Sequence, residues 1–433
     1  GLIENDAFQT IQALPGVESV NEKVSNINIR GGTNDQNLIL WDGIRLYQSG
    51  HFFGLISAIN PHQNHTVSLY KNGTPATYGN SVSSVIELSS AKKLNDDFEA
   101  EVGLTFLSAD AFIDTPLDKK SSIQIAARTS INGAFITPTY LQYYDRAFQN
   151  TEIANSNQNA INTEEDFRFS DVSFRWLYQL SEKDLLRLNY FAIANELSFT
   201  AEEFNQNSME TKESTLSQNS LGMGAFYKRN WTENFSTQLQ LFHSNYHLNS
   251  TNRILNTNTF FEQENNLAET AFKISSKWKL NERFELNSGY EFSSTTSRDA
   301  EADEEITNED LIENRLNVNN VFSSLRYQSS SRKTLIHLGA RINYFNDFDI
   351  LLAEPRLSFN QQFLKNFSVE VLGELKSQYL SQIVNFQNDF LGIENRKWQL
   401  ADQLNFPITK SRQASIGVNY QKNNWLASIE SYV

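Results

Sequence analysis

From about residue 97 onwards, apolar and polar residues alternate with a period of two over long segments. Residues 271–280 are typical, because apolar residues occupy one set of alternate positions and lysines the other: Phe272, Ile274, Trp278 and Leu280 against Lys273, Lys277 and Lys279. The same alternation recurs in residues 284–292, 336–344 and 367–375. Because successive side chains of a β-strand point to opposite faces, this pattern predicts long strands, roughly 14 in all, each with one apolar and one polar face.

The connections between these segments alternate in length. Short polar turns are predicted at residues 181–184, 231–234, 281–283, 329–332 and 364–366. Long polar segments are predicted at about 132–165, 201–214, 250–265, 298–313 and 380–411. Outer-membrane β-barrels have this asymmetry, with short periplasmic turns and longer extracellular loops. A soluble β-sandwich could also have amphipathic strands, but it would not need strands longer than about ten residues.

Composition excludes several other classes of protein. The net charge of −15 argues against a nucleic-acid partner, because phosphate binding needs a basic surface. The chain has no cysteine, which excludes disulfides and thiolate metal sites. The mean hydropathy is −0.48. No apolar run reaches about 18 residues, so a helical transmembrane span is excluded, whereas a barrel strand needs only every second residue to be apolar.

The first 90 residues follow a different pattern. Residues 6–14 have apolar positions at helical spacing, and Pro15 and Gly16 end the predicted helix. In residues 27–46, an alternating strand is broken by two glycines, and an apolar run then stops at Asp42 and Gly43. Because Gly43 can supply the positive φ that a tight turn needs, we expect this segment to form a compact hairpin.

Several short motifs follow one another in this N-terminal region. In order they are Leu14-Pro15-Gly16-Val17, Arg30-Gly31-Gly32, Asp42-Gly43, His51-Phe52-Phe53-Gly54, the run from Pro75 to Tyr78-Gly79, and Ser83-Ser84-Val85. Their order and spacing resemble the plug domain of TonB-dependent outer-membrane receptors. The histidine-phenylalanine-glycine segment and the Ser-Ser-Val run are most similar to the Bacteroidota branch. Most relatives outside that branch have Gly-Gly-Val instead.

The resemblance implies a mainly β fold, in which a transmembrane antiparallel β-barrel holds an N-terminal α+β plug domain in its lumen. We expect the plug at residues 1–90 and the barrel at residues 97–433. Plugged transporters have about 22 strands, so we expect the natural protein to be longer than this chain. The segments expected outside it are a signal peptide, the start of the plug with its TonB box, an N-terminal regulatory-like domain, and the C-terminal strands.

In the family, plug loops that face the outside contact the substrate, and here these match residues 20–26 and 46–55. The candidate substrate-binding residues are Tyr47, Gln48, Ser49, His51, Phe52 and Phe53. Aromatic rings beside a histidine and hydroxyl groups can stack on a ligand or bind it by hydrogen bonds. The alternative is that Phe52 and Phe53 pack the plug against the barrel wall.

The remaining motif residues are expected to be structural: Arg30, Gly31, Gly32, Asp42, Gly43, Tyr78 and Gly79. A buried arginine needs carboxylate partners, so we expect Arg30 to pair with the inward-facing carboxylates Glu285, Glu291, Glu370 and Glu374. A direct role of Arg30 and Asp42 in substrate binding is the alternative.

Neither a metal site nor an enzyme active site is expected. His243 and His247 lie on one strand face about 13 Å apart, too far to share an ion. His62 and His65 are a pair without further ligands. The acidic run of residues 301–305, with Glu309 and Asp310, could bind calcium or bridge lipopolysaccharide, although a solvated loop is the more common explanation. No nucleophile elbow, phosphate loop or zinc-protease helix occurs, and no cofactor is expected.

The leading hypothesis is active import of a scarce or large ligand, such as a siderophore, vitamin, glycan or peptide, across the outer membrane of a Gram-negative bacterium. The resemblance implies energy supply by the inner-membrane TonB–ExbB–ExbD complex. Outer-membrane lipid, lipopolysaccharide, an unidentified ligand and a surface lipoprotein are further expected partners. One alternative is a surface receptor that signals or adheres without transport. A passive porin is another, and the plug motifs argue against it. The fold does not specify the ligand.

Overall fold

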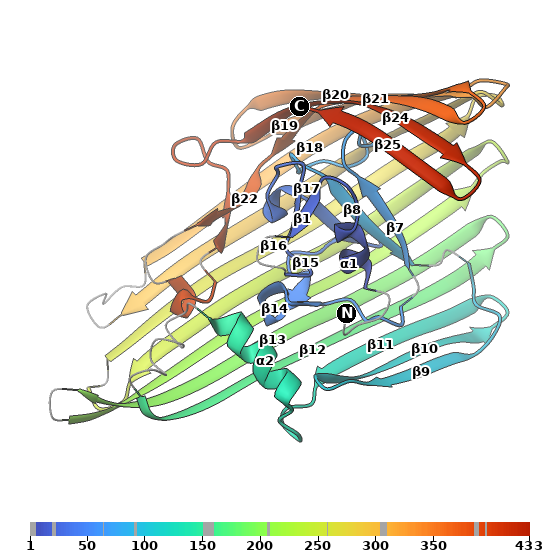
Figure 1. Ribbon diagram of the computed structural model, residues 1–433. Coiled ribbons are helices and arrows are strands. Elements are labelled where there is room, and N and C mark those ends of the chain that lie inside the picture. Colours follow the sequence, from blue (N-terminus) through green and yellow to red (C-terminus); the bar gives the residue numbers. More distant parts are fainter. Residues whose placement is uncertain are drawn as a thin grey trace.

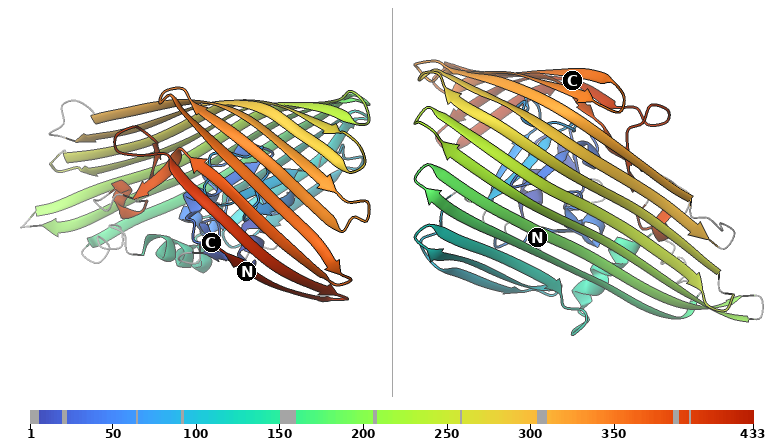
Figure 2. Two further views of the ribbon diagram at one scale, coloured as in Figure 1. Left: turned by 90° about the horizontal axis from the view of Figure 1, so that it is seen from above. Right: turned by 180° about the vertical axis from the view of Figure 1, so that it is seen from behind.

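The computed structural model describes residues 6–19, 23–63, 65–90, 93–149, 160–205, 208–257, 259–303, 310–384, 389–394 and 396–433. One large, curved antiparallel sheet forms a wall, and a small unit built from the N-terminal residues lies against its concave face (Figure 1). Seen from above, the wall is an open trough that holds this unit (Figure 2). We call the N-terminal unit the plug. No helix among the described residues is long and apolar enough to cross a membrane.

Fifteen strands form the wall, in agreement with the roughly 14 expected from the alternation. They are β9 (Glu99–Leu104), β10 (Ser108–Asp118), β11 (Ser121–Ser130), β12 (Ala160–Ser181), β13 (Asp184–Asn205), β14 (Ser208–Asn230), β15 (Phe235–Ile254), β16 (Thr259–Lys279), β17 (Phe284–Asp303), β18 (Asp310–Gln328), β19 (Thr334–Phe345), β20 (Ile350–Leu364), β21 (Phe367–Gln378), β24 (Thr409–Lys422) and β25 (Trp425–Tyr432). Each strand pairs with the next along the chain, except that β21 pairs directly with β24.

Several strands are longer than expected. β12 to β18 have 19 to 23 residues each. The prediction of long loops at residues 201–214, 250–265 and 298–313 was therefore wrong for most of these segments. Spanning a bilayer takes only about 9–11 residues of a strand, and beyond the lipid the backbone ladder continues although both faces carry polar side chains. Of the acidic run, Glu301 and Asp303 belong to β17, and residues 304–309 lie outside the described residues.

The two faces of the wall are chemically different, as the alternation predicted. Apolar side chains such as Ile274, Trp278 and Ile342 are exposed on the outer, convex face. Polar and charged side chains such as Arg341 and Asn343 are buried on the inner face, where Arg341 contacts the backbone oxygen of Thr77 in the plug. A wall of this kind presents apolar groups to lipid and hydrogen-bonding groups to its lumen.

The described residues of the plug form one short helix, two short 3-10 helices and eight short strands. They are α1 (Ala7–Gln12), β1 (Val17–Ser19), β2 (Ile27–Ile29), η2 (Asn34–Gln36), β3 (Leu38–Trp41), β4 (Ile44–Arg45), β5 (Gly50–His51), η3 (Phe52–Gly54), β6 (Ile56–Ser57), β7 (His65–Tyr70) and β8 (Val85–Ser90). Asp6 caps α1, since its side chain accepts hydrogen bonds from the amides of Phe8 at 2.8 Å and Gln9 at 3.1 Å. The predicted helix is thus confirmed.

Residues 27–46 do not form the single hairpin that was expected. β2 pairs with β1, whereas β3 pairs with β4 around Asp42 and Gly43 and runs parallel to β8. The chain changes direction at Arg30 and Gly31, which both have positive φ, and so β2 and β3 enter different sheets. β3 is buried on both faces, which explains its continuous apolar run.

The core of the plug continues into the wall. Phe8 and Ile27 of the plug are fully buried and belong to the same cluster as Phe191 and Ile193 of β13. Trp41 packs edge-on against Phe191, with ring centroids 5.8 Å apart. The plug is therefore held to the wall by shared apolar packing as well as by polar contacts.

A helix and a hairpin segment lie at the end of the wall where the connections are longest. We call this end the outer end. α2 (Pro138–Phe148) follows β11, with Thr137 as its N-cap. Between β21 and β24 the chain forms β22 (Leu380–Val384), η4 (Asp389–Gly392) and β23 (Arg396–Leu400), and β22 pairs with β23. We call these three elements the lid hairpin. Leu380, Phe390 and Leu400 are fully buried, so the lid hairpin packs within the wall and over the plug (Figure 1).

Candidate ligand-binding site

Asp42 joins the centre of the plug to the wall. Its side chain is buried and accepts hydrogen bonds from the amide of Ser90 at 2.9 Å, from the Ser90 hydroxyl, and from Nδ2 of Asn189 on β13 at 2.9 Å. Nη1 of Arg187 lies 3.3 Å from Oδ1 of Asp42. Asp42 thus fixes the end of β8 to β13.

Arg30 also contacts the wall, but through a carboxylate that was not anticipated. Its guanidinium forms an ion pair with Glu430 of β25 and lies 5.0 Å above the ring of Tyr432. Lys71 of the plug lies 3.5 Å from the same glutamate. Glu430 was not among the expected partners; of these, Glu370 lies within electrostatic reach of Arg30, and the other three have cationic neighbours of their own. Glu291 pairs with Arg341, Glu285 with Lys277, and Glu374 lies beside Lys376.

The motif glycines lie where a side chain is disfavoured, either by a positive φ or by lack of space. Gly31 and Gly43 both have a φ of 81°, which only glycine adopts without strain. A Cβ at Gly43 would lie 2.3 Å from the Gln240 side chain, one at Gly79 would lie 2.5 Å from Nε of Arg341, and one at Gly32 would lie 2.5 Å from the Ser83 hydroxyl. Tyr78 donates its hydroxyl to Glu87 within the plug.

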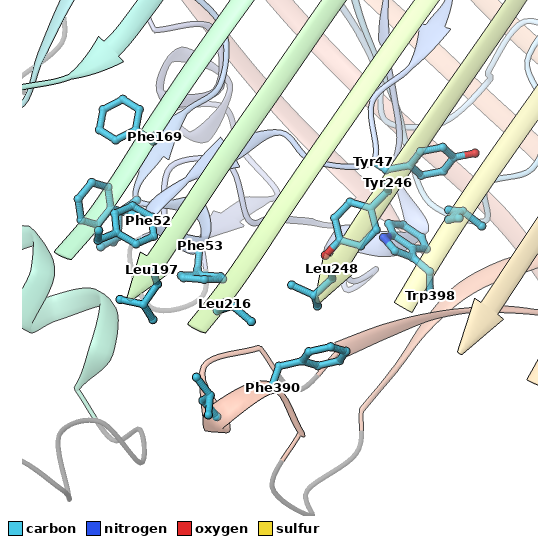
Figure 3. Packing of buried hydrophobic residues seen from close by; sticks show 14 of the residues in the cluster. Tyr47, Phe52, Phe53, Phe169, Leu197, Leu216, Tyr246, Leu248, Phe390 and Trp398 are labelled. Atoms are coloured by element: carbon cyan, nitrogen blue, oxygen red, sulfur yellow. The ribbon is translucent and has the colours of Figure 1, made fainter. Parts of the chain in front are cut away.

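Phe52 and Phe53 pack the outer tip of the plug against the wall (Figure 3). Phe52 is fully buried, and its ring centroid lies 4.2 Å from that of Phe167 and 5.7 Å from that of Phe169. Phe53 lies 6.1 Å from Phe148, the last residue of α2. Both residues have positive φ, 48° and 51°, so the tip is held in a strained conformation by its surroundings.

His51 is fully buried beside these rings. Its Nε2 lies 3.0 Å from a carboxylate oxygen of Asp171, and its Nδ1 lies 2.7 Å from the side-chain oxygen of Asn195. Arg128 donates to the same Asp171 oxygen at 2.7 Å. The wall thus surrounds this histidine, and His51 does not reach the outer surface of the plug.

Tyr47, Gln48, Ser49 and Phe53 line a small cavity at the outer side of the plug, which we call the ligand cavity. Its volume is about 50 Å³. The plug also contributes Ser25, Asn26, Asn34, Gly50 and Gly54, the wall contributes Gln218 and Tyr246, and the lid hairpin and the loop before β23 contribute Gln382, Glu394 and Arg396. Of the two predicted loops, residues 46–55 thus supply most of the plug lining. Residues 23–26 of the other loop are described, and residues 20–22 lie outside the described residues.

The side chain of Gln48 is notable within this cavity. It is 4% exposed, and neither its Nε2 nor its Oε1 has a hydrogen-bond partner among the described residues. An unsatisfied buried amide costs about 1–3 kcal/mol, so such groups are rare in folded proteins. Gln48 therefore offers a free donor and a free acceptor at the outer side of the plug.

The lid hairpin borders the cavity on its outer side. The amide of Gln382 donates to Asp35 of the plug at 3.0 Å. The backbone of Trp398 exchanges two hydrogen bonds with the side chain of Asn265 on β16, at 2.9 and 3.2 Å. The Trp398 ring lies edge-on to Tyr47, with centroids 5.5 Å apart (Figure 3). The lid hairpin therefore connects the plug, the cavity and the wall.

The cavity lining is electrically neutral overall. Among the described residues that line it, Glu394 and Arg396 alone are charged, and they pair with each other at 2.8 and 3.1 Å. Burial, the largest single influence, raises the pKa of Glu394, but Arg396 and Lys23 together outweigh it and hold the pKa below the usual value. The other polar groups are amides and hydroxyls, which suit an uncharged hydrogen-bonding ligand.

A second, larger space lies between the plug and the wall. This chamber has a volume of about 500 Å³. Its lining carries charges of both signs, including Arg45 and Glu87 of the plug and Glu269 and Lys273 of the wall. It is therefore suited to hold water rather than apolar groups.

The histidines of the wall have local partners. His243 lies 2.9 Å from the Thr270 hydroxyl, and His247 contacts Asn266. His62 of the plug lies 2.8 Å from Asp110 and also contacts Glu101. No group of three or more His, Cys, Asp or Glu side chains that could hold a metal ion occurs in the described parts of the chain.

The two predicted loops contain the plug residues of the cavity except Asn34, whereas sequence reasoning identified none of the cavity residues of the wall and lid hairpin. Gln218 and Tyr246 lie on strands whose alternation marks them only as inward-facing, and Gln382, Glu394 and Arg396 lie in a segment that was predicted as a loop. No local sequence signal distinguishes them, because their position depends on how the wall curves around the plug.

Comparison with known proteins supports the assignment of the plug. Residues 4–85 match the model of the TonB-dependent Receptor Plug Domain. No curated protein matches the chain. These findings include no relative that tests the Bacteroidota branch, so that part of the resemblance stays a prediction.

Solved structures with a similar fold include a double mutant of the ferric enterobactin receptor of Pseudomonas aeruginosa, with a TM-score of 0.62 and 13% identity over 99% of this chain and 68% of that chain. The siderophore receptor PirA of Acinetobacter baumannii gives 0.66 and 13%, covering 99% and 68%. The copper transporter OprC gives 0.62 and 10%, also covering 99% and 68%. Residues 4–85 thus match a TonB-dependent receptor plug domain, and the fold of the wall is similar to part of the barrel of these solved receptors.

Proposed function

We propose that the protein imports a scarce or large ligand actively across the outer membrane, with energy from the TonB–ExbB–ExbD complex. The observation that carries this proposal is the ligand cavity, which lies at the outer side of a plug that is packed into the wall. A passive pore would need neither such a cavity nor a plug fixed by buried contacts such as those of Asp42. We also assign residues 1–90 to the plug domain and residues 97–433 to the barrel.

The need for external work follows from binding itself. A site that captures a scarce ligand tightly releases it slowly, because differences in affinity lie mostly in the dissociation rate. The plug blocks the direct route, and its polar contacts with the wall can be replaced by water when it moves. The chamber beside the plug supports this view, since its mixed charges favour a wet path for a polar solute.

Within this function, we assign ligand contact to Tyr47, Gln48, Ser49 and Phe53. Gln48 supports the assignment most strongly, because a ligand that both accepts and donates a hydrogen bond would satisfy its free amide. The cavity of about 50 Å³ holds only a few water molecules, since one water needs about 10–15 Å³ of such volume. We therefore expect the lid hairpin to move outwards when a larger ligand binds.

His51 and Phe52 support this site from behind. Neither lines the ligand cavity, and both are fully buried against the wall. The burial of Phe52 is consistent with the alternative that it packs the plug against the barrel wall. We propose that these two residues hold the loop that presents Tyr47, Gln48 and Ser49.

Import is tested in the natural host. Strains with and without this gene, each with and without a functional TonB, are grown on ferric siderophores, cobalamin, oligosaccharides or peptides as the sole source of the required nutrient. Import predicts that growth on one class requires both the gene and TonB. Ligand binding at the cell surface without TonB-dependent growth would instead favour a receptor that signals or adheres.

The ligand cavity is tested by replacing Gln48 with alanine. Loss of two hydrogen bonds to the ligand should weaken binding about tenfold or more, since a net loss of about 1.4 kcal/mol changes affinity by a factor of ten. Gln9→Ala is the matched control, because Gln9 is an exposed glutamine of the plug helix. Equal affinity of the Gln48→Ala and Gln9→Ala proteins for the imported nutrient would exclude Gln48 from the site.

A further inference from the structure

A chain of hydrogen bonds joins His51 to the ligand cavity. Nδ1 of His51 lies 2.7 Å from the side-chain oxygen of Asn195. Nδ2 of Asn195 lies 2.9 Å from Oε1 of Gln218, and Nε2 of Gln218 lies 3.0 Å from the hydroxyl of Tyr246. The chain thus runs from the plug across β13, β14 and β15. It ends at a hydroxyl group that lines the cavity.

Each member of this chain is shielded from solvent. His51 is fully buried, and Asn195, Gln218 and Tyr246 are 1%, 7% and 3% exposed. Among the described residues, Gln218 alone forms a hydrogen bond with the Tyr246 hydroxyl. The hydroxyl therefore keeps one hydrogen-bonding direction for a molecule in the cavity.

The direction of the chain depends on the charge of His51. Asp171 is paired with Arg128, so it is ionised, and Nε2 of His51 must donate to it. Nδ1 is then a donor if His51 is charged and an acceptor if His51 is neutral. The two side-chain amides can follow either state, because exchanging their oxygen and nitrogen preserves their shape.

The two directions leave different groups at the cavity. When His51 is charged, Asn195 accepts from it, each amide donates to the next member, and the Tyr246 hydroxyl is free to donate into the cavity. When His51 is neutral, every bond reverses, and Tyr246 donates to Gln218. Its oxygen then presents only an acceptor to the cavity.

We propose that His51 sets the hydrogen-bonding polarity of the ligand cavity, acting through Asn195 and Gln218 on the hydroxyl of Tyr246. This inference rests on the proposed function of the cavity. His51 is thereby a positioning residue, since it does not itself reach the ligand. The cavity would prefer a ligand group that donates to Tyr246 while His51 is neutral, and one that accepts from Tyr246 once His51 is charged.

The surroundings of His51 indicate which state is present at neutral pH. Burial, the largest influence, lowers the pKa of His51, and the hydrogen bond and charge of Asp171 oppose this only in part. Arg128 lowers the pKa further. Asp171 and Arg128 are the charged groups that face His51 from β12 and β11. His51 is therefore neutral at pH 7 and becomes charged only as the pH falls through its lowered pKa.

The chain of hydrogen bonds can be tested without a ligand. The whole protein is labelled at the tyrosine Cζ and histidine ring nitrogens and placed in lipid nanodiscs for NMR. Tyr246→Phe and His51→Gln assign the two signals. We expect the Tyr246 Cζ shift to change with the same pH midpoint as the His51 ring nitrogens, and to lose this change in the His51→Gln protein.

Gln218→Met breaks the chain while leaving His51 and Asp171 in place. In this variant His51 should still titrate, which shows that the plug is folded, while Tyr246 no longer follows it. Asn195→Leu provides a second break should Gln218→Met not fold. A Tyr246 signal that ignores His51 in the unaltered protein would overturn the proposal.

The same data separate this inference from the proposed function. Coupled titration of His51 and Tyr246, together with unchanged ligand affinity in the Gln48→Ala protein, would refute the ligand cavity and hence the effect on a ligand. Uncoupled titration refutes the chain of hydrogen bonds whatever the ligand is.

Discussion

Replacement of Asp42 by alanine tests how the plug is fixed in the wall. The buried carboxylate accepts from the amide and hydroxyl of Ser90 and from Asn189, and Arg187 lies 3.3 Å away. In Asp42→Ala these donors lose their acceptor, and the guanidinium keeps only its bond to the backbone oxygen of residue 42, at 2.9 Å.

The expected effect can be worked out from these contacts. Breaking a buried ion pair by removing one partner costs about 3–5 kcal/mol. Because Arg187 retains its bond to the backbone oxygen, we take the lower end, about 3 kcal/mol. A free-energy change of this size raises the population of the undocked plug by a factor of roughly 150, since 1.4 kcal/mol corresponds to a factor of ten.

Amide hydrogen exchange in lipid nanodiscs measures this population. The amides of β8 should exchange on the order of a hundred times faster in Asp42→Ala, because β8 ends at Ser90 and loses its link to β13. Asp97→Ala is the control, since Asp97 is exposed and its side chain forms no hydrogen bond or ion pair with the described residues. Equal protection of β8 in both variants would refute the view that the Asp42 carboxylate holds the plug.

Three further outcomes are expected. Phe52→Ala should destabilise the docked tip of the plug by about 3–5 kcal/mol, seen as faster exchange in residues 52–57, because a fully buried ring is lost. Gly79→Ala should cost about 1–3 kcal/mol in unfolding experiments, because the new Cβ lies 2.5 Å from Nε of Arg341 and displaces it from Glu291. Arg396 holds the pKa of Glu394 below its ordinary value, so this pair stabilises the closed lid at neutral pH, and the contribution is lost as the pH falls through the lowered pKa. Quenching of Trp398 fluorescence by an added quencher should therefore rise in acid.

Each of these outcomes has its own control. Leu141→Ala removes an exposed apolar residue of α2 and should leave residues 52–57 protected. Gly133→Ala should be tolerated, because its Cβ would meet nothing closer than 3.9 Å. Arg396→Met should remove the acid dependence, and the idea fails if Trp398 is equally shielded at every pH.

The sequence contained most of the information about the wall. Alternation identified the inner and outer faces correctly, because a period of two is imposed by the strand backbone itself. It did not locate the ends of the strands. Residues 201–214 were predicted as a loop because they are polar, yet they are paired through to Ser208 opposite Asn205. Polar side chains on both faces of a strand show where the strand leaves the lipid, whereas the backbone hydrogen bonds between strands continue into the water.

The plug motifs predicted the type of contact that each residue makes, but they did not predict which residue of the wall is its partner. Arg30 was expected to meet a wall carboxylate and does so, but the partner is Glu430, which is 400 positions away in the chain. Such a pair depends on the curvature of the whole wall, which no local pattern encodes. The limits of the two domains and the ligand role of residues 47–53 stay predictions.

The way in which the plug is attached has a mechanical consequence. Its polar links to the wall are spaced along the sequence of the plug. Arg30 binds Glu430 of β25, Asp42 binds Asn189 of β13, and the amide of Thr74 donates to Glu374 of β21 at 2.7 Å. A pulling force applied from the N-terminal side would load and break these links one after another rather than all at once. The resting stability of the plug then reflects the sum of the links. The force needed to extract it reflects only the strongest single one.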